Sequence, residues 1–340
     1  MDAQLHSPDL YTIGWIAPLS IERAAATALL DERHKPPEEF NQPESDTNSY
    51  AWGKIGEHNI VIASLPAGVI GTISAATTAS NLVSSLPHIW IGVLVGIGGG
   101  IPRLDQGRDI RLGDVVISQP DGSTGGVIQY DLDKAGSNGT WERRGSLNMP
   151  PLVLLHALAS LKSEHEIAPS KVPGFLSTMW KANPRMAALN NNAPGYTHQA
   201  TEHDKLFHSS YSHIGGTTCD HCDESYLVER RARETTDPAF HYGIIASGNT
   251  LVKEALTRDE VAESTGEDCL CFEMGAAGLM NHFPCIVIRG ISDYADSHKN
   301  DRWQRYAAAT AAAYAKELLS FIPARNLQAT ERAADVMISS

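Results

Sequence analysis

The sequence predicts an α/β fold in which buried parallel strands alternate with helices. Continuous apolar runs at residues 89–95 and 285–288 have the length of strands and the composition of strands that are buried on both faces. Ala-rich segments at 72–86 and 303–319 have the composition of helices that pack closely on a sheet. With 340 residues, of which 42% are hydrophobic and 20% charged, the chain is long enough for one large domain or two small ones.

The composition argues against several classes of partner. A formal net charge of −13 argues against a nucleic-acid-binding surface, which is normally basic. The sequence has no signal-peptide pattern and no apolar run of about 20 residues, so we expect an intracellular, cytoplasmic protein without a membrane partner. Five cysteines are an odd number, and three lie in or beside predicted core strands, which favours reduced thiols over a disulfide framework.

The N-terminal segment places an acidic residue just after a strand. Residues 1–10 are expected to form a loose polar leader, and residues 11–17 a first buried strand. Pro18 ends this strand, and Ser20 is a suitable N-cap for the helix that follows. Glu22 therefore lies in the first turn of a helix. From the residues alone, a carboxylate that complements the helix dipole is favoured over a functional one.

Glycines crowd the end of the strand at 89–95. Four of the next five residues are glycine. Glycines at a strand end let a ligand approach the backbone and leave N–H groups free to bind an anion or a hydroxyl. Four glycines exceed what a turn requires, so a ribose or phosphate cradle that includes Gly98 and Gly99 is favoured over a turn chosen for packing. The segment has neither the Walker A sequence nor the dinucleotide-binding spacing.

Residues 164–238 are polar, rich in histidine and without a clear period, so we expect a functional insertion or lid. Cys219 and Cys222 form a Cys-x-x-Cys pair here, which supplies only two of the four ligands of a zinc site. His208 or His213 could complete a set, but free thiols and solvated histidines are favoured over a metal. Three arginines at 230, 231 and 233 are expected to be a solvated helix face.

The strand at 285–288 leads to the first candidate catalytic residue. It continues into an Arg-Gly-Ile-Ser-Asp sequence that ends at Asp293. Open α/β sheets bind ligands at the carboxyl ends of their strands, which is where Asp293 is expected. A second strand, at 241–246, precedes Ser247, and Leu251 and Val252 are expected to open a helix. Residues 326–340 are expected to form a flexible tail.

Two motifs near the C-terminus resemble those of the nucleoside phosphorylase and methylthioadenosine nucleosidase superfamily. They are Glu-Met-Gly-Ala at 273–276 and Arg-Gly-Ile-Ser-Asp-Tyr-Ala-Asp at 289–296. The resemblance implies a three-layer α/β/α sandwich with a central mixed sheet, formed by residues 11–325 as one domain. Together with YTIGWIA at 11–17 and the glycine cluster, the motifs look like fungal purine nucleosidase-type domains.

The same resemblance implies two catalytic carboxylates. In the superfamily, the Asp of the second motif protonates the leaving purine, which assigns Asp293 as the general acid. In its hydrolytic branch, a Glu that follows an Ile-Gly-x-Ile strand activates water, and the spacing from Ile16 to Glu22 matches that pattern. The phosphorolytic branch has a Gly-Asp-Pro loop with an Arg for phosphate at this point. That loop is not seen, and Arg23 is the only nearby cation.

The implied substrate site includes Gly98, Gly99, Ser247, Leu251, Val252, Glu273, Met274 and Gly275. In the superfamily, residues after the Ser247 position line the purine, and the Met packs on the ribose. The family motif has a second Glu at the position of Gly275, and its carboxylate accepts hydrogen bonds from both ribose hydroxyls. Gly275 cannot provide this contact.

These features together predict a purine nucleoside hydrolase that needs no cofactor and binds its small-molecule substrate as a homo-oligomer. A phosphate-dependent purine nucleoside phosphorylase is the alternative enzyme. A catalytically silent nucleoside-sensing module is an alternative of another class, suggested by Gly275.

Overall fold

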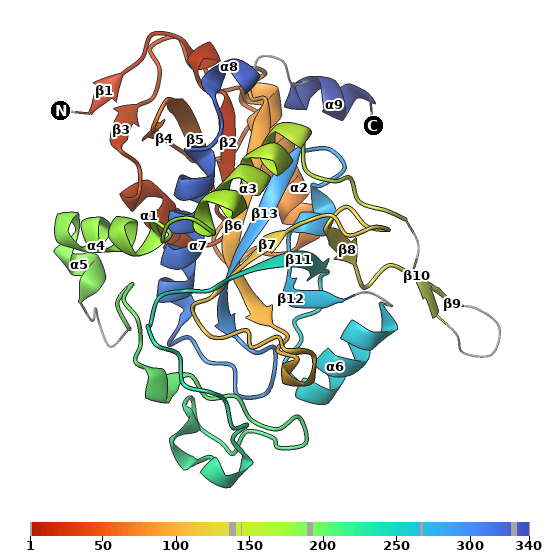
Figure 1. Ribbon diagram of the computed structural model, residues 1–340. Coiled ribbons are helices and arrows are strands. Elements are labelled where there is room, and N and C mark those ends of the chain that lie inside the picture. Colours follow the sequence, from red (N-terminus) through yellow and green to blue (C-terminus); the bar gives the residue numbers. More distant parts are fainter. Residues whose placement is uncertain are drawn as a thin grey trace.

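The structure is a computed structural model that describes residues 2–135, 141–143, 145–188, 193–265, 268–327 and 332–339. Figure 1 shows its central sheet, which has 11 strands in the order β1-β3-β4-β5-β2-β6-β12-β11-β7-β13, with β8 paired to β11. The strands are β1 (Ala3–Gln4), β2 (Ile13–Ile16), β3 (Glu32–Lys35), β4 (Tyr50–Ile55), β5 (His58–Ala63), β6 (Ile91–Gly100), β7 (Val115–Ser118), β8 (Val127–Gln129), β11 (Phe240–Ser247), β12 (Cys269–Glu273) and β13 (Cys285–Asp293). A separate hairpin pairs β9 (Asp133–Ala135) with β10 (Trp141–Arg143).

Part of the sheet closes on itself. β13 pairs with β6 in parallel and with β7 in antiparallel fashion. β11 pairs in parallel with both β7 and β12, and β12 returns to β6 through a short antiparallel contact. β6 and β13 are therefore shared between an open parallel region, which also contains β2 and β5, and a small closed ring of strands. The predicted central mixed sheet is confirmed.

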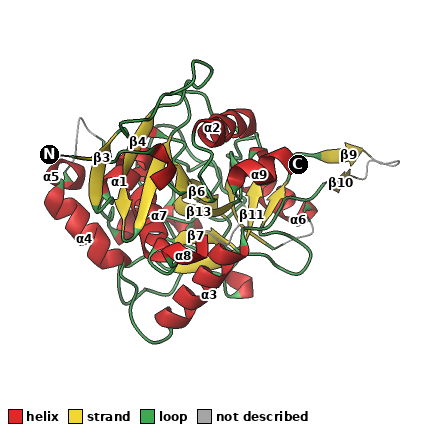
Figure 2. Cartoon of the chain, turned by 90° about the horizontal axis from the view of Figure 1, so that it is seen from above, coloured by secondary structure: helices red, strands yellow, loops and turns green. Residues whose placement is uncertain are grey.

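Helices cover both faces of the sheet, and Figure 2 shows α2 and α7 on opposite sides of β6 and β13. The α-helices are α1 (Ser20–Ala28), α2 (Thr72–Ser85), α3 (Leu152–His165), α4 (Val172–Ala182), α5 (Pro184–Ala187), α6 (Ala255–Ser264), α7 (Gln304–Leu319), α8 (Ala324–Leu327) and α9 (Ala333–Ser339). No helix in the described parts of the chain is long and apolar enough to span a lipid bilayer.

Alternating side chains of β6 build two cores. Ile91, Val93 and Val95 pack in the cluster that includes α1, α3 and α7, whereas Leu94 packs in the cluster that includes α2. This alternation follows from the two-residue period of a strand, and it explains why a strand buried on both faces has a continuous apolar sequence. The three-layer α/β/α arrangement is confirmed.

Both key strands are longer than their apolar runs predict. β6 continues through the glycines to Gly100, and β13 continues to Asp293. The added residues remain in the ladder because Gly99 pairs with both Phe272 of β12 and Asp293 of β13. The glycine cluster is therefore strand and not turn, and the predicted acid is the last residue of its strand.

The two chain ends differ from the expected leader and tail. Residues Ala3–Gln4 of the expected leader pair with β3 at the edge of the sheet. In the expected tail, Ala333 is fully buried and its N–H donates to the carbonyl of Ile89 at 3.0 Å. The tail residues 328–331 and 340 lie outside the described part of the chain.

The predicted insertion has two parts. The first contains α4 and α5, and α4 packs on α7 through Val172, Leu176 and Met179 in the core cluster of α7. The second part, residues 193–239, is built from turns and short 3-10 helices and is the lower green and teal part of Figure 1. Residues 189–192 between the two parts lie outside the described residues.

Arg230 and Arg233 fasten the second part of the insertion to the core, whereas Arg231 is exposed as expected; none of the three lies in a helix, which corrects the expected helix face. Arg230 forms an ion pair with Asp204 at 3.1 Å and donates to Tyr294 Oη at 2.8 Å. Arg233 donates to Asp114 Oδ1 at 2.6 Å. These side chains lie on an extended segment that crosses the domain, so they face buried acceptors and not solvent.

Candidate functional site

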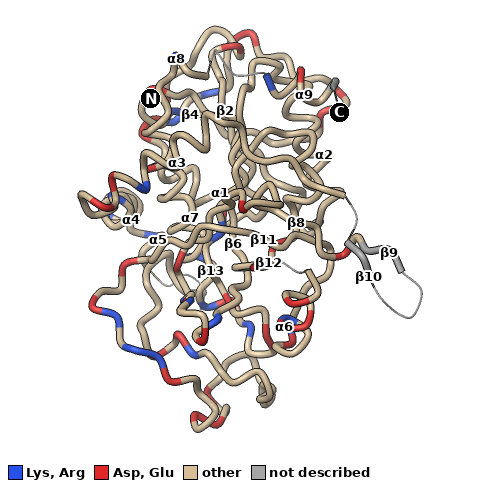
Figure 3. Tube along the Cα trace, turned by 45° about the vertical axis from the view of Figure 1, so that its right-hand side comes forward, with Lys and Arg blue, Asp and Glu red and all other residues tan. Residues whose placement is uncertain are grey.

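A cavity of about 200 Å³ lies at the carboxyl ends of β2, β6, β12 and β13. Figure 3 shows acidic and basic residues intermingled at the lower ends of β6 and β13. The charged side chains that line the cavity are Glu22, Glu273, Arg289, Asp293 and Lys299, and its apolar wall includes Leu65, Ile70, Leu251, Phe272 and Met274. Residues from both ends of the chain thus meet at the sheet edge where α/β folds bind ligands.

Glu22 lies in the first turn of α1 and is almost fully buried. Its Oε2 accepts the N–H of Leu19 at 2.6 Å, which satisfies a free donor at the start of the helix. Its Oε1 accepts the N–H of Ile97 at 2.7 Å, from the glycine segment of β6. The carboxylate therefore both caps its own helix, as the residues alone favoured, and faces the cavity.

The electrostatic environment of Glu22 makes it a stronger base than an ordinary glutamate. Burial raises the pKa of the Glu22 carboxyl above its usual value of 4.5, while the Arg289 guanidinium opposes the increase. The negative charge of Glu273 adds to the increase. A carboxylate whose ionised form is destabilised in this way takes up a proton more readily from a bound water.

Arg289 is a buried cation in the middle of the site. Its guanidinium forms an ion pair with Glu273, and both side chains are at most 3% exposed. Its Nε has no hydrogen-bond partner among the described residues. A Cβ placed on Gly96 would lie 2.5 Å from Glu22 Oε1 and would also overlap the Arg289 guanidinium. Gly96 therefore makes room for Glu22 and Arg289.

Asp293 ends β13 with each carboxylate oxygen in a hydrogen bond. Oδ1 accepts the N–H of Ala295 at 3.0 Å, and Oδ2 accepts the hydroxyl of Ser292 at 2.8 Å. Oδ2 also forms an ion pair with the Lys299 ammonium. The role of general acid requires a proton on this carboxyl group. A ligand group that reaches Asp293 has to replace Lys299.

Glycines in β6 allow the backbone to pass close to the acid. A Cβ on Gly99 would lie 2.9 Å from Asp293 Oδ1, and one on Gly98 would lie 3.0 Å from the carbonyl oxygen of Phe272. A Cβ on Gly99 would therefore require Asp293 or Ala295 to shift, and one on Gly98 would require a smaller adjustment of its neighbours. Close approach to cavity side chains and to neighbouring strands thus accounts for these glycines, and both line the cavity.

The motif residues at 273–275 lie at the rim of the same cavity. The carboxylate of Glu273 accepts the N–H groups of Gly275 and Ala276, each at 2.9 Å, at the start of the 3-10 helix η7 (Ala276–Gly278). Met274 is partly exposed beside it. Glu273 is therefore held by the backbone and by Arg289, and its carboxylate has little capacity left to replace the missing second Glu.

Two predicted substrate residues do not line this cavity. Ser247 is fully buried, and its hydroxyl accepts the N–H of Ala277 at 2.8 Å, so it fixes the position of η7. Val252 is buried in a core cluster with Tyr130 and Phe272. Leu251, at 46% exposure, does line the cavity, and the helix after it begins only at Ala255.

The sequence interpretation did not assign Arg289, Lys299, Phe272 or Ile70 to the site, although all four line the cavity. Arg289 had a detectable signal, because a charged residue inside an apolar strand requires a buried partner. Lys299 follows Asp293 by six residues in a loop and offered no such signal. Arg23, the nearby cation noted in the sequence, instead donates to Ser64 Oγ at 3.1 Å.

Comparison with curated proteins finds a fungal relative. The chain is 40% identical over 322 residues to a nucleotide-binding leucine-rich repeat (NLR)-like protein of Hyaloscypha variabilis. The match covers 95% of this chain but only 30% of the relative, so the chain corresponds to about a third of that protein's length. No family model matches the chain.

Comparison with solved structures finds the same fold in bacterial enzymes. A 5'-methylthioadenosine/S-adenosylhomocysteine nucleosidase from Neisseria meningitidis, in complex with methylthio-immucillin-A, is 15% identical with a TM-score of 0.56, covering 91% of this chain and 99% of the enzyme. A futalosine hydrolase from Helicobacter pylori is 14% identical with a TM-score of 0.56, covering 92% and 99%. The chain therefore has the fold of the nucleoside phosphorylase and nucleosidase superfamily.

Proposed function

We propose that this chain is a purine nucleoside hydrolase that cleaves the N-glycosidic bond to give free base and ribose. The main support is that Glu22 and Asp293 line one cavity at the strand ends, although they lie 271 residues apart in sequence. Structural neighbours described as nucleosidases and as a futalosine hydrolase support the reaction class through their shared fold.

Glu22 and Asp293 reach the cavity at separate points. The Glu22 carboxylate lies against Gly96 and the Asp293 carboxylate against Gly99, two different residues of β6. Two separate carboxyl groups, one for the leaving group and one for water, are the arrangement that inverting glycoside hydrolysis uses.

In the proposed reaction Glu22 accepts a proton from water, and the water oxygen attacks C1' of the ribose. The bond between C1' and the purine nitrogen breaks, and its electron pair moves to the base. Asp293 donates a proton to N7 of the leaving purine. Lys299 forms an ion pair with Asp293, so the incoming base replaces this contact when it reaches the carboxyl group.

The charges of the cavity favour water over phosphate as the nucleophile. Three carboxylates, of Glu22, Glu273 and Asp293, face two cations, of Arg289 and Lys299. Each cation already forms an ion pair with a carboxylate. An incoming phosphate would add negative charge to a site with an excess of it, so phosphorolysis is the less favoured reaction.

The proposal is tested by measuring free purine released from adenosine, inosine and guanosine in phosphate-free buffer. Glu22→Gln and Asp293→Asn are each expected to lower turnover at least about 100-fold, because each removes a proton-transfer group. Glu57→Gln, on an exposed turn, is the matched control and keeps the parental rate. Unchanged release by either cavity variant would refute the assignment, and strict dependence on added phosphate would establish the phosphorylase.

A nucleoside-sensing module is the second candidate, because Gly275 removes a ribose contact and the fungal relative is described as NLR-like. Calorimetric titration with the same nucleosides distinguishes the two. Saturable binding without turnover, which persists in Gly275→Glu, supports sensing and contradicts hydrolysis.

We also propose that the chain forms a homo-oligomer. Val69, Ile70 and Ile73 are apolar and at least 52% exposed, and Ile70 lines the cavity. We expect a second copy of the chain to cover them. Light scattering after gel filtration tests this, and a monomer at high protein concentration would contradict it.

A further inference from the structure

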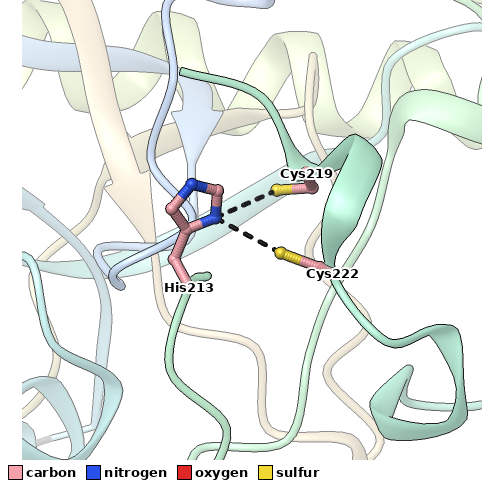
Figure 4. Close-up of side chains that lie close together, drawn as sticks. All are labelled: His213, Cys219 and Cys222. Carbon is pink, nitrogen blue, oxygen red and sulfur yellow. Dashed lines mark hydrogen bonds between the residues drawn. The ribbon is translucent and has the colours of Figure 1, made fainter. Parts of the chain in front are cut away.

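Three side chains suited to metal binding meet in the insertion, outside the cavity described above. His213 Nδ1 lies 3.3 Å from Cys222 Sγ and 3.9 Å from Cys219 Sγ, as Figure 4 shows. All three atoms lie within 4.8 Å of one another. Both cysteines are free thiols, and Cys222 is buried. The structure thus selects His213 from the histidines near the Cys-x-x-Cys pair.

The separations match those around a tetrahedral zinc ion. Zinc has Zn–S bonds of about 2.3 Å and Zn–N bonds of about 2.0–2.1 Å, so a sulfur and a nitrogen on one ion lie about 3.5 Å apart. The 3-10 helix η5 (Cys219–His221), with the N–H of Cys222 bonded to the carbonyl of Cys219 at 3.2 Å, turns both sulfurs toward His213. Little movement is needed to bind an ion.

The orientation of His213 suits a metal ligand. Its other ring nitrogen, Nε2, lies 3.3 Å from the carbonyl oxygen of Gly216. A proton on Nε2 is therefore placed to donate to that carbonyl, which leaves the Nδ1 lone pair directed at the two sulfurs. Metal-bound histidines normally have such a second hydrogen bond, because it fixes both the ring and its tautomer.

A fourth candidate ligand, the His298 imidazole, lies near this group but outside the cluster whose ligand atoms are within 4.8 Å of one another. Nε2 of His298 is buried and has no hydrogen-bond partner among the described residues. The ring centres of His298 and His213 are 5.5 Å apart, close to the value of about 5 Å for two imidazoles on one tetrahedral zinc. On the other side of the ring, Nδ1 lies 3.8 Å from Asp296 Oδ2, and Phe207 stacks on the ring at 4.1 Å.

We propose that His213, Cys219, Cys222 and His298 bind one zinc ion that fastens the insertion to the loop between Asp293 and Lys299. That loop already contacts the insertion, because the N–H of His213 donates to Ser297 Oγ at 2.9 Å. Cys219, Asp293 and His298 also line one small cavity of about 40 Å³. Zinc thereby fixes the segment that carries two charged residues of the substrate cavity.

Zinc content of the full chain, purified without a metal-binding tag, tests the proposal independently of any turnover. We expect one zinc per chain in the parent and at least about tenfold weaker zinc binding in each ligand variant. Those variants are His213→Ala, Cys219→Ser, Cys222→Ser and His298→Gln. The matched controls are His208→Ala and His221→Ala, exposed histidines of the same segment, which are expected to retain zinc.

Because a ligand variant can fail to fold, the parent chain is also stripped with a chelator and titrated with Co²⁺. Tetrahedral visible bands and a thiolate-to-cobalt charge-transfer band, both saturating at one equivalent, are expected. The proposal would be overturned if the purified parent contained no zinc and the stripped parent gave no cobalt spectrum. A Cys219–Cys222 disulfide in protein kept under reducing conditions would also overturn it. Full zinc affinity in His298→Gln would overturn the four-ligand assignment.

Discussion

Replacing Gly275 with Glu is expected to increase nucleoside hydrolysis, because the change supplies a carboxylate where the resembling family contacts the ribose. The backbone permits the change. A Cβ on Gly275 would lie 3.6 Å from both Ala75 Cβ and Glu273 Oε2, and 3.8 Å from Arg289 Nη2, all ordinary contacts. Its φ of −137° is open to any residue. The added charge lies near Glu273, but the Arg289 guanidinium offsets the repulsion.

The size of the gain follows from the two hydrogen bonds to the ribose hydroxyls. Hydrogen bonds to a charged group contribute about 1.5–3 kcal/mol each, or about 3–6 kcal/mol for two. Ordering a Glu side chain costs up to about 2 kcal/mol. The remaining gain of about 1–4 kcal/mol corresponds to an increase in kcat/KM on the order of tenfold to a thousandfold.

The assay is release of free purine in phosphate-free buffer, with Gly275→Gln as the matched control. The glutamine has the same size without the charge, and its neutral hydrogen bonds contribute about 0.5–1.5 kcal/mol each. Gly275→Glu should therefore release purine faster than Gly275→Gln, and circular dichroism checks that both variants are folded. Equal rates for the two folded variants, or no gain in either, would refute the reasoning about the ribose contact.

Three further predictions concern Glu22, Arg289 and the glycines of β6. Hydrolysis requires the ionised form of Glu22, and burial raises the pKa of this carboxyl above 4.5. The value of kcat/KM should therefore fall as the pH decreases, with the midpoint of this acid limb above pH 4.5. A midpoint at or below pH 4.5 would contradict the prediction. The Arg289 guanidinium lowers the same pKa, so Arg289→Met should move the acid limb to higher pH and Arg289→Lys should move it less. Gly99→Ala, with its Cβ 2.9 Å from Asp293 Oδ1, should lower turnover at least about tenfold, whereas Gly174→Ala, with open space at its Cβ, should not; equal rates in the two would exclude the close-approach argument.

Local sequence patterns predicted the elements that hold the site. The continuous apolar runs marked β6 and β13 because each strand is buried on both faces, and the parallel arrangement brings their carboxyl ends together. Glu22 and Asp293 each lie just after an apolar strand run, so their meeting followed from the fold class. The family resemblance added their expected chemical roles, which remain predictions.

Other features depend on pairings between distant segments, which local patterns do not encode. Ser247 is the last residue of β11, and its hydroxyl accepts the N–H of Ala277 in the interior. In the loop that follows, Val252 packs in a core cluster, whereas Leu251 lines the cavity. Arg233 meets Asp114 across 119 residues. An extended segment has no sequence period that indicates which side is buried, so Arg230 and Arg233 were wrongly expected to face solvent.

The buried charges bear on the choice between turnover and sensing. Glu22, Glu273 and Arg289 are each at most 4% exposed, and burying an ionised group costs several kcal/mol even when it is paired. A site that only binds a neutral nucleoside needs neutral polar groups and an apolar wall such as that of Leu65, Ile70 and Phe272. It gains nothing from a carboxylate whose basicity burial has increased. Burial raises the pKa of Glu22, and its carboxylate faces the cavity. Both features suit a base that activates water, so they favour hydrolysis over sensing.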